Sequence, residues 1–201
     1  MKVLVATTNS AKVAEISRIL LDCGLDSFGL PAAECDDVQE TGATFEENAL
    51  IKARYHHQRT GLITVADDSG LEVDALGGAP GIRSARYAGP GATDAVRIRR
   101  LLGDLSEVPG DKRGARFVCA AAIAWKGGER VFPGEVHGRI LDSPRGLDGF
   151  GYDPVFFYAP LSRTFAELTR EQKSKVSHRG IAFEKLAAWI KLEGLESLLG
   201  P

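Results

Sequence analysis

One segment of the sequence, residues 62–71, constrains the fold more than any other. Residues 62–66 are apolar and rich in β-branched side chains, which is the composition of a buried strand. The sequence Asp-Asp-Ser-Gly follows at 67–70, and these residue types favour turns. The segment therefore predicts a buried strand that stops at an acidic turn. Such a turn is either a solvated bend or a place where carboxylates bind a divalent cation or transfer a proton.

Apolar and amphipathic stretches alternate in the first half of the chain. Residues 3–6 predict a strand, and residues 12–23 predict a helix that ends at Gly24. A second helix is predicted from a capping box at Thr44 to about Gln58, directly before the strand at 62–66. This alternation favours an α/β fold.

The second half of the chain predicts antiparallel pairing. Apolar runs at 115–125 and 130–136 flank turn residues at 126–128, so they are expected to form a hairpin. A short strand is expected at 155–158. We therefore expect an α/β fold with a mixed sheet flanked by helices, in one domain of two lobes over residues 1–201. Three helices are expected in this half. The first runs from Thr93 to Leu102, the second begins at Thr169, and the third follows a break at 177–180.

The composition restricts the classes of partner. The chain has 201 residues, 44% of them hydrophobic, and a formal net charge of −2. It is long enough for one sizeable core or two lobes, and it lacks the basic patches that binding to nucleic acid or to an anionic membrane would require. No run of about 18 apolar residues is present. We expect a soluble cytoplasmic protein with three reduced thiols, Cys23, Cys35 and Cys119.

A polar turn, Thr-Thr-Asn-Ser-Ala-Lys at 7–12, joins the first strand to the first helix. Backbone N–H groups and the helix dipole make such a place an anion site. The turn lacks the glycines of a P-loop, and the alternative is an ordinary helix cap followed by an exposed lysine. Glu40 and Lys52 are a weaker candidate pair, because a loop and a helix face could bring both toward Asp68.

A long glycine-rich loop at 77–89 carries Arg83 and Arg86. Long loops are often functional, and the arginine fork suits phosphate oxygens. The alternative is a surface lid with solvated arginines. The glycines would allow this loop to close over a substrate, which the sequence leaves open.

Phe150 lies between two glycines in Gly-Phe-Gly-Tyr-Asp-Pro at 149–154. Its ring could stack on a base, a contact of about 1–3 kcal/mol without base preference, or it could be a core aromatic residue. Selectivity could come from Lys173, His178 and Arg179, whose donors suit the 6-keto oxygen of a purine and oppose the amine of adenine. Donors alone do not exclude guanine, and a histidine at a helix start is often structural.

These segments, in this order, resemble the inosine triphosphate pyrophosphatase family over nearly the whole chain. The resemblance implies hydrolysis of inosine, deoxyinosine or xanthosine triphosphate to the monophosphate and pyrophosphate. It further implies Mg²⁺ as cofactor and a cleft between two lobes of a homodimer. It rests on motifs at 7–12, 40–54, 66–81, 149–154 and 177–180.

The resemblance also implies roles for individual residues. Asp68 would accept the proton of the attacking water, and Glu40 and Asp68 would bind the magnesium ion. The substrate would be bound by Thr7, Thr8, Asn9, Ser10, Ala11, Lys12, Lys52, Ser69, Phe150, Gly151, Tyr152, Asp153, Lys173, His178 and Arg179. The family often has glycine where Thr8 and Ala11 stand. Asp67 has no implied role, and it need not share that of Asp68, because neighbouring side chains of an extended chain point to opposite faces.

Two other functions fit parts of the same pattern. One is a pyrophosphatase for modified pyrimidine or methylated nucleotides, which would need a different base pocket. The other is a module that binds a nucleoside triphosphate without cutting it. The Ser-His-Arg sequence at 177–179 argues against the first, and the combination of Asp68, Lys52 and Glu40 argues against the second.

Overall fold

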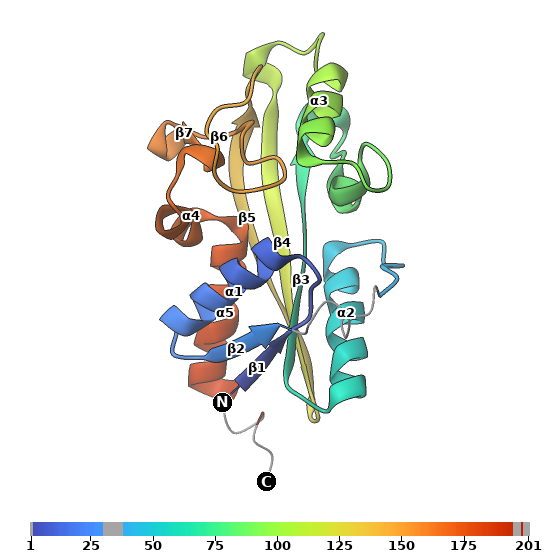
Figure 1. Cartoon of the computed structure of the whole chain (residues 1–201), viewed down its shortest axis with the longest axis vertical. Helices are drawn as coiled ribbons and strands as arrows, with labels where there is room; N and C mark the ends of the chain where they lie inside the picture. The colour runs from blue at the N-terminus through green and yellow to red at the C-terminus, as the bar shows by residue number, and fades with distance from the viewer. Residues whose placement is uncertain (1, 30–37, 195–197, 199–201) are drawn as a thin grey trace. The chain divides into compact units, whose positions relative to one another are not determined.

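The computed structural model describes residues 2–29, 38–194 and 198, so Cys35 lies outside the described residues. It has an α/β fold built on a mixed sheet (Figure 1). The strands are β1 (Lys2–Val5), β2 (Asp26–Gly29), β3 (Thr64–Val73), β4 (Gly114–Trp125), β5 (Gly128–Ile140), β6 (Phe156–Tyr158) and β7 (Arg163–Thr164). The α-helices are α1 (Ser10–Asp22), α2 (Phe45–Thr60), α3 (Asp94–Asp104), α4 (Arg170–Val176) and α5 (His178–Trp189). A π-helical turn follows at Ile190–Gly194.

Within the described residues the sheet has seven strands in the order β2-β1-β3-β4-β5-β6-β7. Strand β1 pairs in parallel with β2 and β3. Strand β6 pairs antiparallel with β5 and β7. The expectation of a mixed sheet is therefore confirmed. The short strands β2 and β7 were not predicted, because neither contains an apolar run or a clear alternation.

The chain divides into two compact units. Unit 1 comprises Met1–Asp68, Cys119–Gly134 and His178–Pro201, and unit 2 comprises Ser69–Val118 and Glu135–Ser177. The divisions fall inside β3, β4 and β5 or close to the start of α5. Each unit is therefore assembled from segments that are distant in the sequence.

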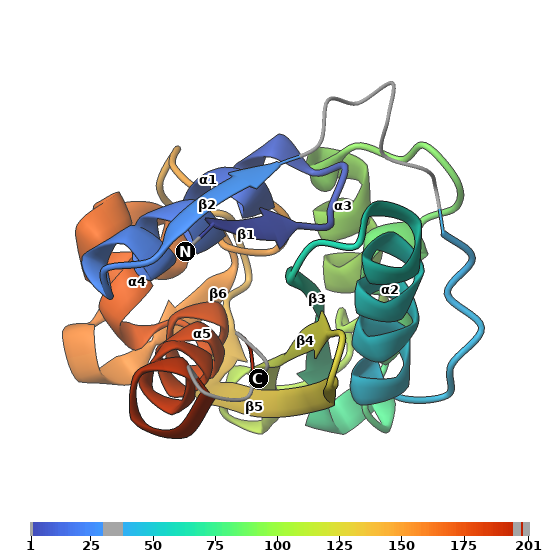
Figure 2. The ribbon, with the colours of Figure 1, turned by 90° about the horizontal axis from the view of Figure 1, so that it is seen from below.

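Unit 1 has a core in which strands and helices interdigitate. Its fully buried side chains include Val5 of β1, Leu20 of α1, Ile123 of β4 and Phe183 of α5. Helices α1 and α5 contact each other. In Figure 2, α5 lies on one side of β3 and α2 lies on the other. Strand β3 in this unit is thus covered by helices on both faces, which explains its continuous burial.

Unit 2 has a separate, aromatic core. Phe165 packs against Phe117 and Phe156, with ring centroids 5.8 Å and 4.9 Å apart. Leu101 and Leu105 of α3 belong to the same core. Burial of these large side chains gives unit 2 a hydrophobic centre of its own.

The helix boundaries follow the local capping signals closely. Gly61 ends α2 in a left-handed conformation, at φ 70°. Helix α4 begins with a complete capping box between Thr169 and Gln172. No helix among the described residues is long and apolar enough to cross a membrane. The N-caps are Asn9 for α1, Thr44 for α2, Thr93 for α3 and Thr169 for α4.

The predicted acidic turn is wrong. Strand β3 continues through residues 67–70 to Val73, and Asp67 and Asp68 are 1% and 7% exposed. Turn preference at Asp, Ser and Gly is local, whereas here neighbouring strands pair with the backbone and cations pair with both carboxylates. Gly70 is part of the strand and does not make a bend.

Two further expectations need correction. The loop at 77–89 is not irregular throughout, because its residues Gly81–Arg86 form a 3₁₀ helix. The predicted break at 177–180 is only one residue wide, since α4 ends at Val176 and α5 begins at His178. Ser177 in an extended conformation separates the two helices, so Arg179 and Gly180 are helical.

Candidate active site

The two aspartates of β3 point to opposite faces of the strand within unit 1. Asp67 contacts Lys12 of α1 and Arg179 of α5. Asp68 contacts Lys52 of α2. This division agrees with the positions of α5 and α2 on either side of β3 (Figure 2). It confirms that the neighbouring carboxylates belong to different clusters.

Asp67 is the centre of a buried ion-pair network. Its Oδ2 lies 3.0 Å from Lys12 Nζ and accepts hydrogen bonds from Arg179 Nε and Nη2 at 3.2 and 3.1 Å. Arg179 Nη1 donates to Glu15 Oε2 at 2.6 Å. Burial acts to raise the pKa of Asp67, but Lys12 and Arg179 outweigh it and hold that pKa far below its usual value. The network therefore stays charged and fixes the positions of Lys12 and Arg179.

Asp68 belongs to a second cluster, with Lys52 and Glu40. Lys52 Nζ donates to Glu40 Oε1 at 2.6 Å and to Asp68 Oδ1 at 3.4 Å. Burial raises the pKa of Asp68, and Lys52 opposes this shift. Burial acts to lower the pKa of Lys52, but Asp68, Asp67 and Glu40 together raise it above its usual value. Lys52 is thus a cation held between two carboxylates.

The donor set of this cluster fits a divalent cation that also binds the substrate. Asp68 Oδ2 is buried and has no hydrogen-bond partner in the described part of the chain. No group of three or more His, Cys, Asp or Glu side chains among the described residues could hold a metal ion. Mg²⁺ prefers oxygen ligands and keeps several waters, so two carboxylates with substrate phosphates are a sufficient set.

The polar turn before α1 has features of an ordinary helix cap, but the lysine that follows the cap is not exposed. Asn9 Oδ1 accepts from the backbone N–H groups of Ala11 and Lys12 at 3.0 and 3.3 Å, as an ordinary cap does. Thr7 Oγ1 accepts from the N–H of Asn9 at 3.2 Å. Lys12 is not an exposed lysine, since its side chain is 17% exposed and bound to Asp67. The turn is therefore ordered by its own side chains, and it ends at Lys12, a largely buried cation.

In unit 2, residues 149–153 form a segment that we call the aromatic turn. Asp153 Oδ2 accepts from Lys173 Nζ at 2.6 Å and from the backbone N–H of Phe150 at 2.9 Å. Lys173 Nζ lies 4.7 Å from the centre of the Phe150 ring. Gly149 has φ 79°, and a Cβ there would lie 2.2 Å from Asp153 Oδ2. Lys173 therefore covers one face of the Phe150 ring.

His178 and Arg179 begin α5 in unit 1 and are 4% and 1% exposed. Strand β5 comes very close to this helix start at Gly134. A Cβ on Gly134 would lie 2.2 Å from His178 O and 2.6 Å from the backbone N of Ala182. Gly134 therefore permits the packing that places His178 and Arg179, a role that the sequence alone did not reveal.

The predicted site residues fall into two groups by unit. Within unit 1 the structure joins Lys12 to Arg179 through Asp67, and Lys52 to Glu40 and Asp68. Within unit 2 it joins Phe150, Asp153 and Lys173. The members in unit 1 are residues 7–12, Glu40, Lys52, Asp68, His178 and Arg179, and those in unit 2 are Ser69, Phe150, Gly151, Tyr152, Asp153 and Lys173.

Sequence reasoning missed residues that bind the predicted ones. Glu15 holds Arg179, and Asp94 accepts a hydrogen bond from the N–H of Gly151. Glu15 is three residues from Lys12, so from sequence it resembles half of a solvated helix pair. Asp94 follows an N-cap, where an acidic residue is expected for the helix dipole alone. Neither position carried a signal of a distant partner.

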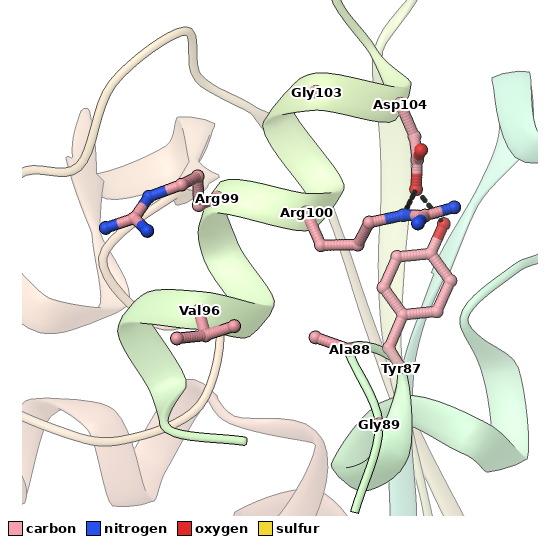
Figure 3. Close-up of a pocket in the computed structure, with 8 residues that line it drawn as sticks. All are labelled: Tyr87, Ala88, Gly89, Val96, Arg99, Arg100, Gly103 and Asp104. Carbon is pink, nitrogen blue, oxygen red and sulfur yellow. Dashed lines mark hydrogen bonds and ion pairs between the residues drawn. The ribbon is translucent and has the colours of Figure 1, made fainter.

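A pocket of about 720 Å³ lies elsewhere in unit 2, beside α3 (Figure 3). Its polar groups largely bond to one another: Tyr87 Oη and Arg100 Nε donate to Asp104 Oδ2 at 2.6 and 2.9 Å. Arg99 points away from these three side chains (Figure 3). No residue that lines this pocket is a predicted site residue, and we assign it no role in the site.

The fold and the site together indicate the class of protein. The chain is an α/β protein with a mixed sheet, and its site brings two carboxylates and a lysine together. These groups suit metal-assisted cleavage of a phosphoanhydride. The family model described as Ham1 family matches residues 3–189. The chain belongs to the Ham1 family.

Individual relatives match over nearly their whole length. A protein of Frankia alni named dITP/XTP pyrophosphatase is 49% identical over 199 residues, which are 95% of this chain and 98% of that protein. The solved structure of a HAM1 protein from Coxiella burnetii has a TM-score of 0.85 and 41% identity, covering 95% of this chain and 98% of that one. A Mycobacterium abscessus structure described as nucleoside-triphosphatase / dITP/XTP pyrophosphatase has 48% identity and a TM-score of 0.73, covering 96% and 100%.

Proposed function

We propose that this chain hydrolyses the non-canonical purine nucleoside triphosphates dITP, XTP and ITP to the nucleoside monophosphate and pyrophosphate. The observation that carries the proposal is the Asp68 cluster, in which one buried carboxylate oxygen faces Lys52 and the other has no partner in the described chain. Relatives at 49% identity that are named dITP/XTP pyrophosphatase support the same reaction. The activity would remove deaminated purines from the nucleotide pool.

Cleavage between the α and β phosphates requires two things from the protein. Charge on the leaving pyrophosphate must be neutralised, and a water must be held in line with the bond that breaks. Lys12 and Lys52 supply fixed positive charge, because buried carboxylates hold both ammonium groups in place. Asp68 is the proposed acceptor of the water's proton. Asp67 acts by holding Lys12 and Arg179 rather than by touching the substrate.

We propose Mg²⁺ as the cofactor, held by Glu40 and Asp68. When bound, it would neutralise phosphate charge at the bond being cut. Glu40 and Asp68 would orient it through carboxylate oxygens, and Lys52 would remain as the adjoining cation. Chelation should therefore abolish turnover and added Mg²⁺ should restore it.

The base end of the substrate is assigned to the aromatic turn and to the donors of Lys173, His178 and Arg179. Stacking on Phe150 would contribute affinity, and donors would favour a 6-keto purine over adenine. Lys173 and Arg179 already bind carboxylates in this structure. A base contact from either side chain would thus add to, or replace, one of these bonds.

The proposal is tested by measuring kcat/KM with Mg²⁺ for the triphosphates of deoxyinosine, xanthosine, guanosine and adenosine. Pyrophosphate and phosphate are scored separately. We expect pyrophosphate as the product, with dITP and XTP preferred by at least about 100-fold over ATP. Hydrogen-bond donors that are placed for a keto oxygen are left unpaired when the base carries an amine at that position. Equal rates for all purines, or release of single phosphates, would contradict the proposal.

The two alternative functions predict other results in the same assay. A pyrophosphatase for modified pyrimidine or methylated nucleotides would prefer those substrates when they are added to the panel. A binding module would retain a triphosphate without releasing pyrophosphate. Each outcome identifies its own function and excludes the proposed one.

Assembly and location are part of the proposal as well. We infer a homodimer, a cytoplasmic location and a single catalytic domain to which both units contribute. Light scattering coupled to size exclusion should give twice the chain mass of 21.6 kDa. A chain-mass value at micromolar concentration would contradict the dimer.

A further inference from the structure

The aromatic turn is held in part by Asp94, a residue that lies outside every predicted motif. Asp94, the first residue of α3, accepts a hydrogen bond through Oδ2 from the backbone N–H of Gly151 at 2.7 Å. Its other oxygen, Oδ1, pairs with Arg97 Nη2. Asp94, Arg97 and Gly151 all belong to unit 2. One carboxylate thus connects the start of a helix to the turn that carries Phe150.

Two consecutive amides of the aromatic turn are bound by two different carboxylates. The N–H of Phe150 donates to Asp153 and the N–H of Gly151 donates to Asp94. Gly151 has φ 63°, a left-handed conformation that glycine adopts easily. A glycine backbone can also adopt many other conformations at little cost. An acceptor on its N–H selects one of these conformations. The orientation of the Phe150 ring depends on the same peptide group, because that group joins Phe150 to Gly151.

Arg97 extends the connection to the loop at 77–89. Its Nη1 donates to the backbone oxygens of Ala85 and Ala92 at 2.9 and 2.6 Å. From the other side, Tyr152 Oη donates to Ser84 O at 2.9 Å, and Tyr152 is 3% exposed. The aromatic turn, the start of α3 and the 81–86 segment are therefore joined by side-chain hydrogen bonds within unit 2.

We propose that Asp94 is a positioning residue, which sets the orientation of Phe150 for base stacking through its hydrogen bond to Gly151. Arg97 supports this role, because it pairs with Asp94 and anchors α3 to the 81–86 segment. The inference rests on the proposed function insofar as Phe150 stacks on the base. The bonds of Asp94 itself go to Gly151 and Arg97, and we assign it no contact with the substrate.

The first test measures the hydrogen bond without any substrate. Amide exchange of Gly151, followed by NMR, should be at least about ten-fold faster in Asp94→Ala than in the wild type, because the amide loses its acceptor. Thr93→Ala is the matched control. It removes the N-cap bond to Val96 at the same helix end and leaves Asp94 in place. Unchanged Gly151 exchange in Asp94→Ala would overturn the proposal.

The second test separates KM from kcat. Asp94→Ala should raise KM for dITP on the order of ten-fold, which is within the 1–3 kcal/mol range of a base stack. Its kcat should stay within about two-fold of the wild type, because the Asp68 cluster is untouched. Thr93→Ala and Asp104→Ala should keep wild-type KM. Asp104 is a suitable control because it is also an α3 aspartate paired with an arginine, yet it binds Tyr87 instead of the aromatic turn (Figure 3).

A double-mutant cycle with Phe150→Ala identifies the route of the effect. If Asp94 acts through the ring, Asp94→Ala should change KM by less than about two-fold once the ring is gone. The same factor in both backgrounds would overturn the proposal. Should Asp94→Ala fail to fold, Asp94→Leu, which fills more space, is judged by the same cycle.

The proposed function and the positioning role fail in different ways. Absence of wild-type dITP turnover refutes the function. Normal wild-type turnover with additive effects of Asp94→Ala and Phe150→Ala refutes only the positioning role.

Discussion

At the residue scale, Asp67 and Asp68 show how neighbouring identical side chains acquire different tasks. The strand sends one carboxylate toward Lys12 and Arg179 and the other toward Lys52. Through Oδ2, Asp67 pairs with two cations, Lys12 and Arg179, which suits a structural role. Asp68 keeps an oxygen without a partner in the described chain, which suits chemistry.

Asp68→Asn should lower kcat for dITP by about 10²–10⁴-fold, because an amide does not accept the proton of the attacking water. The dissociation constant of a non-hydrolysable analogue should change little, since the lysines remain. Single-turnover kinetics and calorimetric titration measure the two quantities. Turnover at the wild-type rate would remove Asp68 from its assigned role.

Asp67→Asn should reduce the free energy of unfolding by about 3 kcal/mol or more. The substitution removes one of the two carboxylates that pair with Arg179, which is 1% exposed, and breaking a buried ion pair from one side is costly. Asp68→Asn is the matched control, expected to change stability by about 1 kcal/mol or less. Urea unfolding measures both. Equal losses in the two variants would show that Asp67 is no more structural than its neighbour.

At the element scale, the helices begin and end where their capping residues predict, whereas β3 continues through residues that predict a turn. The caps at Thr44 and Thr169 and the stop at Gly61 satisfy backbone groups within a few residues, so neighbours in sequence suffice to specify them. The Asp-Asp-Ser-Gly stretch of β3 lies in a strand because distant strands and cations complete it. Local preference therefore fails where tertiary partners are strongest.

Thr44→Ala should lower the free energy of unfolding by about 1 kcal/mol, because the N–H of Glu47 loses its side-chain acceptor at the start of α2. Thr44→Ser retains the hydroxyl and should stay near the wild-type value. Thermal and urea unfolding report the difference. If both variants lose equally, the hydroxyl is not the cap.

Gly134→Ala should cost about 1–3 kcal/mol, because the new Cβ meets backbone atoms of α5 that cannot turn away. It should also raise KM, since the same contact places His178 and Arg179. Gly103→Ala, in α3, is the control. Nothing lies within 4 Å of a Cβ there, so the helix should gain about 0.5–1 kcal/mol. A neutral Gly134→Ala would mean that α5 can shift without cost.

At the scale of the whole molecule, each unit has its own hydrophobic core, but three strands have residues in both units. Residues that fill the core of unit 1 come from three segments and those of unit 2 from two, and β3, β4 and β5 contribute to both units. A strand cannot unfold in one unit without affecting its continuation in the other. We therefore expect cooperative unfolding.

Leu20→Ala in the unit 1 core and Leu101→Ala in the unit 2 core should each cost about 2–5 kcal/mol, since both side chains are fully buried. Each variant should shift the same single transition, seen identically by tryptophan fluorescence and by circular dichroism. Leu192→Ala, at an 82% exposed position, should leave that transition nearly unchanged. Two transitions, of which each variant moves only one, would show that the units unfold independently.

The amino-acid sequence by itself determined the fold class, the helix ends and the central hairpin, and it supplied the residues proposed for the candidate site. These depend on periodicity, capping and short motifs, which are local properties of the chain. Only the tertiary structure decided that β3 passes through its acidic residues, that Asp67 binds Lys12 and Arg179, and that Asp94 reaches Gly151. These contacts join positions that are up to 112 residues apart. Because burial and ion pairing act through space, no local pattern could have marked them.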